Sequence, residues 1–185
     1  MANLHPLLSD ILDFWFAPDT RAAWFNATPA IDADIRTRFK ATWHTGMAGT
    51  FDACRDCAAS CLAQVILFDQ LPRNMYRDTV QRFASGAKAL TVAAHAIEQG
   101  FDEMLDGHRR IFLYMPYMHS ESLTDQDRCI ELLERSGAKD NLFWARHHRE
   151  IIARFGRFPH RNAILGREST AEEIAWLTSD DAFHG

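Results

Sequence analysis

The stretch "CRDCAASCLAQVILFDQLPRN", residues 54–74, indicates the class of fold to which the chain belongs. Its three cysteines fall at positions i, i+3 and i+7, and Leu62, Val65 and Phe68 continue the same apolar stripe. Residues with this spacing lie on one face of an α-helix, whereas a half-buried strand alternates apolar and polar residues. The stretch therefore predicts a buried helix. We expect Pro72 to end it, because the residue before a proline avoids the helical conformation.

The same helical period recurs along the rest of the chain. It predicts further helices at about residues 4–15, 31–43, 78–99, 106–118, 124–136, 141–155 and 170–176. No segment alternates apolar and polar residues convincingly, and no Asn-Gly pair marks a hairpin turn. We therefore predict an all-α fold without β-sheet, with about eight short helices joined by short loops. One domain is expected over residues 1–178, followed by a frayed tail at residues 179–185.

Capping signals place the ends of several of these helices. Asp78 with Gln81 resembles a capping box, and Thr124 is expected to cap the helix that follows it. A second capping box is expected before the last helix, formed by Ser169 or Thr170 with Glu172 or Glu173. Glycines follow three of the expected helix ends, at Gly100, Gly137 and Gly156.

Composition and charge narrow the class of protein. The 185 residues carry a net charge of −5, with 47% hydrophobic and 24% charged residues, as in ordinary soluble domains. The acidic balance argues against binding to nucleic acid or to a membrane surface, since both favour a cationic face. The longest apolar run, "IFLYMPYM", is too short to span a bilayer, and the first residues read as an amphipathic helix. We expect a cytoplasmic protein.

The cysteines allow two interpretations. Cys54, Cys57 and Cys61 could form a redox pair or a metal site, or they could fill the apolar face of a helix. No second CxxC pair follows, and Cys129 stands alone in the sequence. We favour packing, because spacing that suits a helix face needs no metal. No metal and no cofactor is expected.

Polar residues at the end of the opening stretch form the first candidate site. Asp69 lies four residues after Val65 on the apolar face, where a carboxylate must lose its charge or find a cation. Arg73 is near, but Pro72 is expected to disturb the helical spacing, so the cation could also come from elsewhere. We favour a structural ion pair over a general base. Arg73, Asn74 and Arg77 could cap the helix carbonyls or grip the phosphate or carboxylate of a ligand.

The segment "YMPYMHSES" and the helices after it supply a second set. The helix before it is expected to kink or break near Pro116. His119 and Glu121 could form a catalytic acid–base pair, but we favour capping of the next helix by Ser120 or Ser122 as the role of this segment. Further along the chain, Gln126 and His148 point toward expected core faces. We treat both as candidate ligand contacts, beside the alternative that each is a hydrogen-bonded core residue.

The densest set of polar residues lies in "GRFPHRNAILGREST", residues 156–170. It places cations and an amide among Phe, Ile and Leu: Arg157, His160, Arg161, Asn162 and Arg167. Each arginine must be solvated, paired with an acid such as Asp69, Glu121 or Glu168, or available to bind an anion. The segment repeats part of "DQLPRN", residues 69–74, where an apolar residue and Pro also precede an Arg-Asn pair.

Taken together, "FDQLPRNMYR", "YMPYMHSE" and "FGRFPHRNAILGREST" resemble the blocks of a bacterial group, the domain-of-unknown-function family 924. The "LDFWF" start at residues 12–16 fits the same order, and the likeness runs from about Ile11 to Leu177. The resemblance implies a compact stack of helix pairs of the tetratricopeptide-like superfamily. It implies no established activity, substrate or cofactor.

Three hypotheses for the function follow. In the first, the separate segments line a pocket for a small anionic ligand, with Arg73, Asn74, Arg77, Gln126, His148, Arg157, Arg161, Asn162 and Arg167 as binding residues. Catalysis, if the protein is an enzyme, would use His119 or His160 with Glu121 or Asp69. In the second, a helical scaffold binds an acidic peptide. In the third, the charged motifs pair with one another and lock helices together. The excess of arginine over nearby acids favours the first.

Overall fold

The computed structural model describes residues 4–24, 26–179 and 182, and every regular element among them is helical. The prediction of an all-α fold is confirmed for this part of the chain. Most of the tail predicted to fray, residues 180–181 and 183–185, lies outside the described residues. Across the described ranges, no helix is both long and apolar enough to cross a membrane.

The chain divides into two compact units according to its internal contacts. The first unit comprises residues 1–77 and 81–116, and the second comprises residues 78–80 and 117–185. The expectation of one domain over residues 1–178 stays a prediction.

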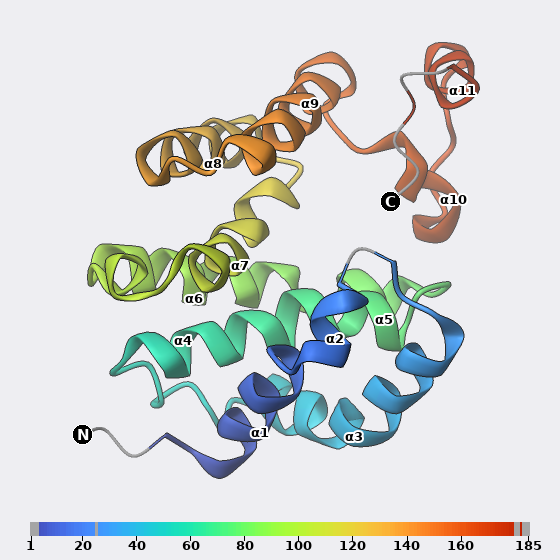
Figure 1. Ribbon diagram of the computed structural model, residues 1–185. Helices are drawn as coiled ribbons and strands as arrows, with labels where there is room; N and C mark the ends of the chain where they lie inside the picture. Colours follow the sequence, from blue (N-terminus) through green and yellow to red (C-terminus); the bar gives the residue numbers. More distant parts are fainter. Residues whose placement is uncertain (1–3, 25, 180–181, 183–185) are drawn as a thin grey trace. The chain divides into compact units, whose positions relative to one another are not determined.

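The first unit contains the longer series of helices (Figure 1). In chain order these are α1 (Pro6–Trp15), α2 (Pro18–Ala22), α3 (Pro29–Met47), α4 (Ala58–Val65), the π-helical turn η1 (Ile66–Gln70), α5 (Leu71–Met75), the 3-10 turn η2 (Val80–Phe83), α6 (Gly86–Glu98), the 3-10 turn η3 (Phe101–Met104) and α7 (Gly107–Met118). The last two residues of α7, after Pro116, belong to the second unit.

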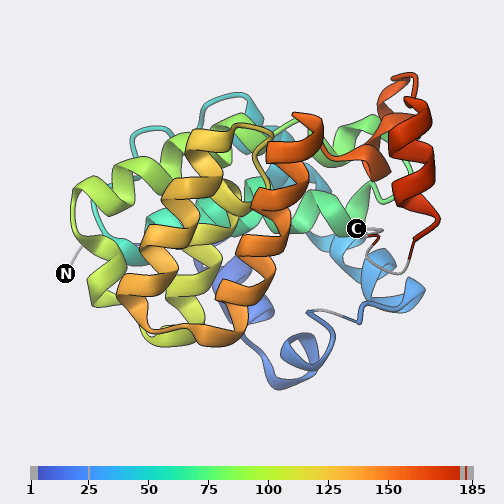
Figure 2. The same cartoon turned by 90° about the horizontal axis from the view of Figure 1, so that it is seen from above.

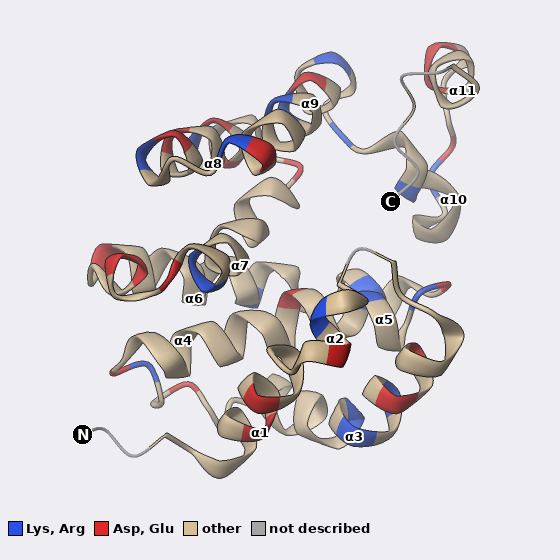
Figure 3. Cartoon of the chain, viewed as in Figure 1, with Lys and Arg blue, Asp and Glu red and all other residues tan. Residues whose placement is uncertain are grey.

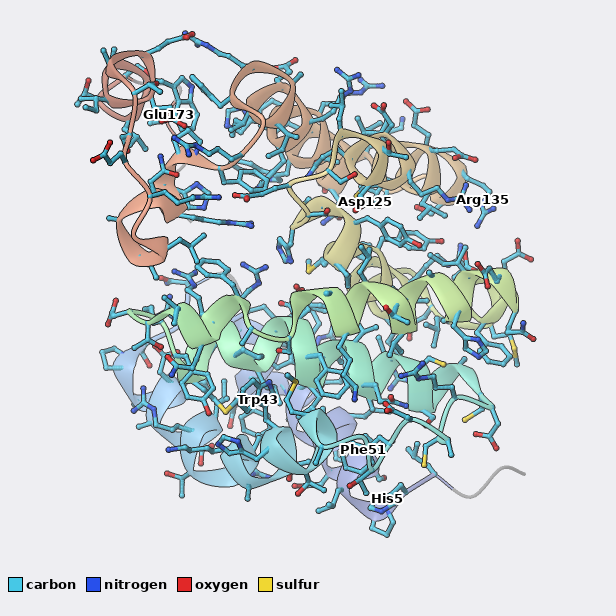
Figure 4. All side chains as sticks on the ribbon, turned by 180° about the vertical axis from the view of Figure 1, so that it is seen from behind. His5, Trp43, Phe51, Asp125, Arg135 and Glu173 are labelled. Atoms are coloured by element: carbon cyan, nitrogen blue, oxygen red, sulfur yellow. The ribbon has the colours of Figure 1, made fainter. Side chains whose placement is uncertain are left out.

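α4 forms the centre of the first unit. It carries no charged residue, so Figure 3 draws it without blue or red, and nearly all of its side chains are buried. It packs against α1 and α6, while α3 packs against α5. Around this centre, Trp43 on α3 is buried, and the rings of His5 and Phe51 meet edge to face, 5.1 Å apart (Figure 4). From Cys61 onward, the stripe that the sequence predicted is therefore part of the core of this unit.

The helix predicted to end before Pro72 continues through it. Proline has no N–H to donate, and its ring would clash with the carbonyl four residues back, that of Phe68. The π-helical turn η1 widens the backbone at this point, and the hydroxyl of Ser85 donates to the Phe68 carbonyl at 2.6 Å. Ser85 in turn accepts a bond from the indole N–H of Trp43 at 3.0 Å. Pro72 is accommodated because a side chain from another segment replaces the missing donor.

α3 approaches this π-helical turn closely at one glycine. A Cβ placed on Gly46 would lie 2.9 Å from the ring of Phe68 and 3.0 Å from Leu67. Real Cβ atoms essentially never come so near. The glycine is therefore required by packing, since its φ is not positive.

Several predicted helix boundaries before α7 are wrong. The cysteine stripe enters the helix at its N-cap, Cys57, so Cys54 lies in the preceding turn and not on the helix. The capping box predicted at Asp78 and Gln81 does not form. Residues 80–83 make a 3-10 turn instead, and α6 begins at Gly86 after Ser85, whose hydroxyl donates to the Phe68 carbonyl and does not cap the helix. The short helix α2 was not predicted.

The second unit is built on a helical hairpin. α8 (Leu123–Ser136) and α9 (Lys139–Phe155) lie side by side, as Figure 2 shows, and Gly137 joins them with a left-handed φ of 74°. η4 (Pro159–Arg161), α10 (Asn162–Leu165) and α11 (Ala171–Leu177) follow. A small core joins α9 to these last elements: Ile151, Ile152, Phe158 and Trp176, with Phe155 and Leu177 at its edge.

The caps of the second unit test the sequence predictions directly. Ser122, not Thr124, caps α8, because its hydroxyl accepts from the Asp125 amide at 3.4 Å. The last capping box is confirmed: Thr170 and Glu173 exchange bonds with each other's backbone amides at 3.1 and 2.7 Å.

Candidate functional site

The residues that the sequence singled out fall into one group in each unit. Asp69, Arg73, Asn74 and Arg77 belong to the first unit. The larger group belongs to the second unit and comprises His119, Glu121, Gln126, His148, Arg157, His160, Arg161, Asn162 and Arg167. The sequence led us to expect Arg73 and Arg161 in one pocket. Because the two residues belong to different units, this expectation stays a prediction.

In the first unit, Asp69 is buried within the π-helical turn, with 3% of its surface exposed. Nη2 of Arg73 lies 3.3 Å from its Oδ1, and Nε2 of Gln70 donates to its Oδ2 at 2.5 Å. The expectation that Pro72 disturbs this spacing is wrong, because the chain stays helical from Asp69 to Arg73. The contact supplies the cation that a buried carboxylate needs.

Asn74 and Arg77 bind a second carboxylate, Asp32 at the start of α3. Arg77 donates from Nε and Nη2 to the two oxygens of Asp32 at 2.8 and 3.0 Å, and Asn74 donates at 2.8 Å. Burial acts to raise the pKa of Asp32, but these hydrogen bonds and the Arg77 charge outweigh it, so the net pKa is lowered. Sequence analysis missed Asp32, because an acid in the first turn of a helix is expected from the helix dipole alone.

In the second unit, Glu121 is the centre of the cationic group. Arg167 grips its carboxylate with two bonds of 2.8 and 3.0 Å, and the backbone amide of Phe158 donates at 2.9 Å. Nη1 of Arg161 lies 3.9 Å from the same carboxylate. Burial acts to raise the pKa of Glu121, but the bonds from Arg167 and Phe158 and the two positive charges lower it overall. At neutral pH Glu121 is therefore an ionised acceptor rather than a proton donor.

Arg161 is the most buried arginine of this group, with 7% of its surface exposed. Its Nη1 donates to the backbone carbonyl of His119 at 3.0 Å, and its Cζ lies 4.1 Å from the centre of the Phe158 ring. A planar guanidinium favours such stacking, and its position is fixed by the ring and by the carbonyl. The side chain is thus oriented by its own unit.

Arg157 and Asn162 converge on Glu173 of α11, which Figure 4 labels. Arg157 donates to both oxygens at 2.6 and 2.8 Å, and Asn162 donates at 3.3 Å. The Thr170 amide adds a fourth bond. The bond from Arg157 contributes most to lowering the pKa of Glu173 to about 2, against the opposing effect of burial. Sequence analysis assigned Glu173 to capping, and the residue both caps α11 and neutralises Arg157.

Gln126 and His148 are buried and bonded to the backbone. The amide of Gln126 donates to the carbonyls of Met118 and Ser120 at 2.8 and 2.7 Å. Nδ1 of His148 lies 2.7 Å from the Trp144 carbonyl. Since a carbonyl can only accept, Nδ1 carries the proton. Burial lowers the pKa of His148 to about 3, and the nearby positive groups act in the same direction.

Two further polar residues of the second unit are Ser120, which lies at the start of α8, and His160, which packs against an aromatic ring. The Ser120 hydroxyl donates to Asp125 at 2.6 Å, which fits a role at the start of α8. The ring of His160 packs 5.5 Å from that of Phe158. We call Arg157, Arg161, Arg167, Glu121 and Glu173 the Arg–Glu cluster of the second unit.

Of the three cysteines of the stripe, only Cys61 follows the packing interpretation, because Cys54 lies before α4, Cys57 is its N-cap and both are half-buried. Cys61 and Cys129 are buried, and burial raises the pKa of each thiol to about 12, so both stay protonated. Within the ranges that the structure describes, no three His, Cys, Asp or Glu side chains are placed to hold a metal ion.

Comparison with known proteins places the chain in a family. The model of a bacterial protein of unknown function (DUF924) matches residues 11–181. The chain belongs to this family. A solved structure described as a protein of unknown function from Agrobacterium tumefaciens is 38% identical to it, covers 93% of this chain and 97% of its own, and superimposes with a TM-score of 0.86. No curated protein gives a significant match.

Two blocks of this DUF924 member meet in the second unit. Glu121, from "YMPYMHSE", binds Phe158 and Arg167, both from "FGRFPHRNAILGREST". The partners lie up to 46 residues apart in the chain. The blocks on which the resemblance rests are therefore physically joined through one carboxylate.

Proposed function

We propose that this DUF924 member binds a small anionic ligand, carrying a phosphate or carboxylate group, at the Arg–Glu cluster of its second unit. Arg161 is the central binding residue. The observation that carries the proposal is that the Arg161 guanidinium is buried, stacked on Phe158 and oriented by the His119 carbonyl.

Orientation before binding favours affinity. An arginine on the surface loses side-chain freedom when it grips an anion, whereas Arg161 is already ordered. The Arg–Glu cluster holds three arginines against two glutamates, and the other two arginines each grip one glutamate, so the positive charge in excess is that of Arg161. A planar guanidinium matches the oxygens of a phosphate or carboxylate group with two parallel bonds.

The three arginines have different roles in this proposal. Arg157 and Arg167 each hold a glutamate with a two-bond fork, so they fix the loop between α9 and α11. Arg161 lies between them in sequence and makes the more distant contact with Glu121, at 3.9 Å. A bound anion would therefore compete with Glu121 for Arg161 without breaking either fork.

Acid–base chemistry at the site would use His119 or His160. Imidazole titrates near neutral pH, as a general acid or base requires. Because its pKa is lowered, Glu121 stays ionised, so in this proposal it would stabilise a histidine cation rather than donate a proton. Asp69 belongs to the first unit, so its part in such chemistry rests on the wider prediction that the two groups meet.

Thermal shift with defined anions tests the binding. We expect inorganic phosphate, or members of a panel of phosphorylated and carboxylated metabolites, to raise the Tm. A ligand at 100 times its Kd adds about 2.7 kcal/mol to the free energy of unfolding. Arg161→Lys keeps the charge but loses the planar fork, and is expected to weaken binding at least about tenfold. Arg154→Lys, an exposed arginine paired with Glu172, is the matched control.

The proposal fails if no anion in the panel raises the Tm. It also fails if Arg161→Lys and Arg154→Lys respond to every anion as the wild type does.

The second candidate function is a scaffold of the tetratricopeptide-like kind, which binds an acidic peptide. In this scaffold most of the arginine motifs are structural, and the two-bond forks to Asp32, Glu121 and Glu173 support that part of it, because arginines neutralised in this way serve to fix loops. A partner recovered in stoichiometric amounts, and lost on changing Arg73 or Arg161, would favour this function over the first.

A further inference from the structure

The outer face of α9 carries an exposed apolar surface in the second unit. Phe143 and Trp144 are 67% and 48% exposed, which is unusual for large aromatic side chains. A shallow hollow of about 470 Å³ follows this face, lined by Lys139, Leu142, Phe143, Arg146, His147 and Glu150. The spacing of three and four residues confirms that one side of the helix forms it. We call these six residues the α9 face.

The chemistry of the α9 face is complementary to itself. The positions of the six residues are symmetric about the midpoint of the face, which lies between Trp144 and Ala145. Symmetric positions need not carry side chains that attract one another. In this case two of the three pairs are favourable when the face is turned end for end. Lys139 pairs with Glu150, and Phe143 pairs with Arg146, which gives an ion pair and a cation–π contact.

We infer that the α9 face docks a second copy of this chain, with the two α9 helices antiparallel across a twofold axis. In such an interface residue i of one protomer contacts residue j of its partner, and j contacts i. Each favourable pair therefore occurs twice. Antiparallel helices also bring opposite ends of their dipoles together, which adds to the charge complementarity.

The charged residues of α9 are compatible with this arrangement. Figure 3 shows both signs of charge along the helix. Arg146 pairs with Glu134 of α8 at 2.8 Å, and both side chains are more than half exposed. A surface pair of this kind is weak, so the guanidinium can also cover the partner's aromatic ring. Lys139 and Glu150 lie at the two ends of the hollow, where they act as a polar rim around Phe143.

Sedimentation velocity and light scattering of the purified full chain test the inference over a wide range of concentration. We expect a concentration-dependent dimer. Phe143→Asp is expected to raise its Kd at least about tenfold, because aromatic side chains at the centre of an interface contribute most to binding. Ile174→Asp is the matched control, since Ile174 is also an exposed apolar residue, 54% exposed, on α11.

Charge exchange tests the antiparallel register. Lys139→Glu and Glu150→Lys each place like charges opposite one another twice in a homodimer, so each alone is expected to dimerise more weakly than the wild type. Mixed in equal amounts, the two variants restore both ion pairs and should form a heterodimer. These side chains are exposed, so the chain should fold even if Phe143→Asp does not.

A chain that stays monomeric at every concentration would overturn the inference. A dimer that resists Phe143→Asp, or variants that fail to form the heterodimer on mixing, would overturn it as well. If the chain stays monomeric and a different protein binds this face, the inference is overturned as well.

Discussion

At the scale of single residues, burial decides what each titratable side chain can do. His148 and Glu121 both belong to the second unit, but their environments act in opposite ways. His148 is buried beside positive groups, which favours the neutral ring. Glu121 is half-buried between arginines, which favours the charged carboxylate. The same cationic surroundings thus keep one group neutral and the other ionised.

His148 makes the stability of the chain depend on pH in a defined window. Its pKa falls from 6.5 to about 3 on folding. Below pH 6.5 the imidazole of His148 is protonated in the unfolded chain but stays neutral in the folded chain. The free energy of unfolding therefore decreases as the pH falls from 6.5 to about 3. For one proton, each pH unit changes the folding equilibrium by up to about tenfold. His148→Phe should flatten this slope in urea denaturation at a series of pH values.

The control for this prediction is His108→Phe, which replaces an exposed histidine of α7 and should leave the slope in place. An unchanged slope in His148→Phe would contradict the assignment.

At the scale of helical elements, one proline and one serine determine how the centre of the first unit is built. The helix passes Pro72 because η1 opens the backbone and Ser85 satisfies the carbonyl of Phe68. The related motif around Pro159 has a different local structure, since Gly156 ends α9 and a 3-10 turn follows. Similar letters in "DQLPRN" and "GRFPHRN" therefore give different elements, because the partners that surround them differ.

Ser85→Ala tests this account of the π-helical turn. The substitution removes the donor to Phe68 and the acceptor for Trp43, both buried, so two polar groups lose their partner. Each such group costs about 1–3 kcal/mol, and we expect denaturant unfolding to show a loss in that range or above it. Ser136→Ala is the control, because that hydroxyl bonds a carbonyl at the end of α8. Equal losses in the two variants would argue against the special role of Ser85.

At the scale of the whole molecule, both units contain the same arrangement of hydrogen bonds around a carboxylate. A carboxylate receives a two-bond fork from an arginine and a further bond from an amide group: Asp32 in the first unit, Glu121 and Glu173 in the second. Each of these carboxyls has a lowered pKa. Acid should therefore weaken both units.

The acid profile of the chain follows from these carboxylates. Because their folded pKa values are depressed, their contribution is complete above the unfolded values of 3.8 and 4.5 and is lost as the pH falls, to about pH 2 for Glu173. Denaturation should therefore show a steeper loss of stability below about pH 4.5, where the protonation of these carboxylates adds to that of His148. Glu173→Gln should remove part of it, whereas the neighbouring Glu172→Gln, at a side chain 61% exposed, should match the wild type. Identical profiles for the two variants would refute the prediction.

What the sequence by itself determined is local. Helical period, glycines such as Gly156 and the Thr170 capping box act over a few residues, so the helix class, most helix positions and the last cap could be predicted from neighbouring letters. The polar residues of the candidate site could also be recognised from their density among apolar neighbours. Their type, however, did not reveal their partners.

Only the tertiary structure decided which groups meet. Arg77 binds Asp32, which is 45 residues away in the sequence, and Arg167 binds Glu121, which is 46 residues away. Any of several acids would have satisfied either arginine equally well in the sequence. The passage of the helix through Pro72 depends in the same way on Ser85, a residue 17 positions from the carbonyl that it satisfies. Electrostatic and hydrogen-bond energies depend on distance in space, which packing sets and sequence separation does not.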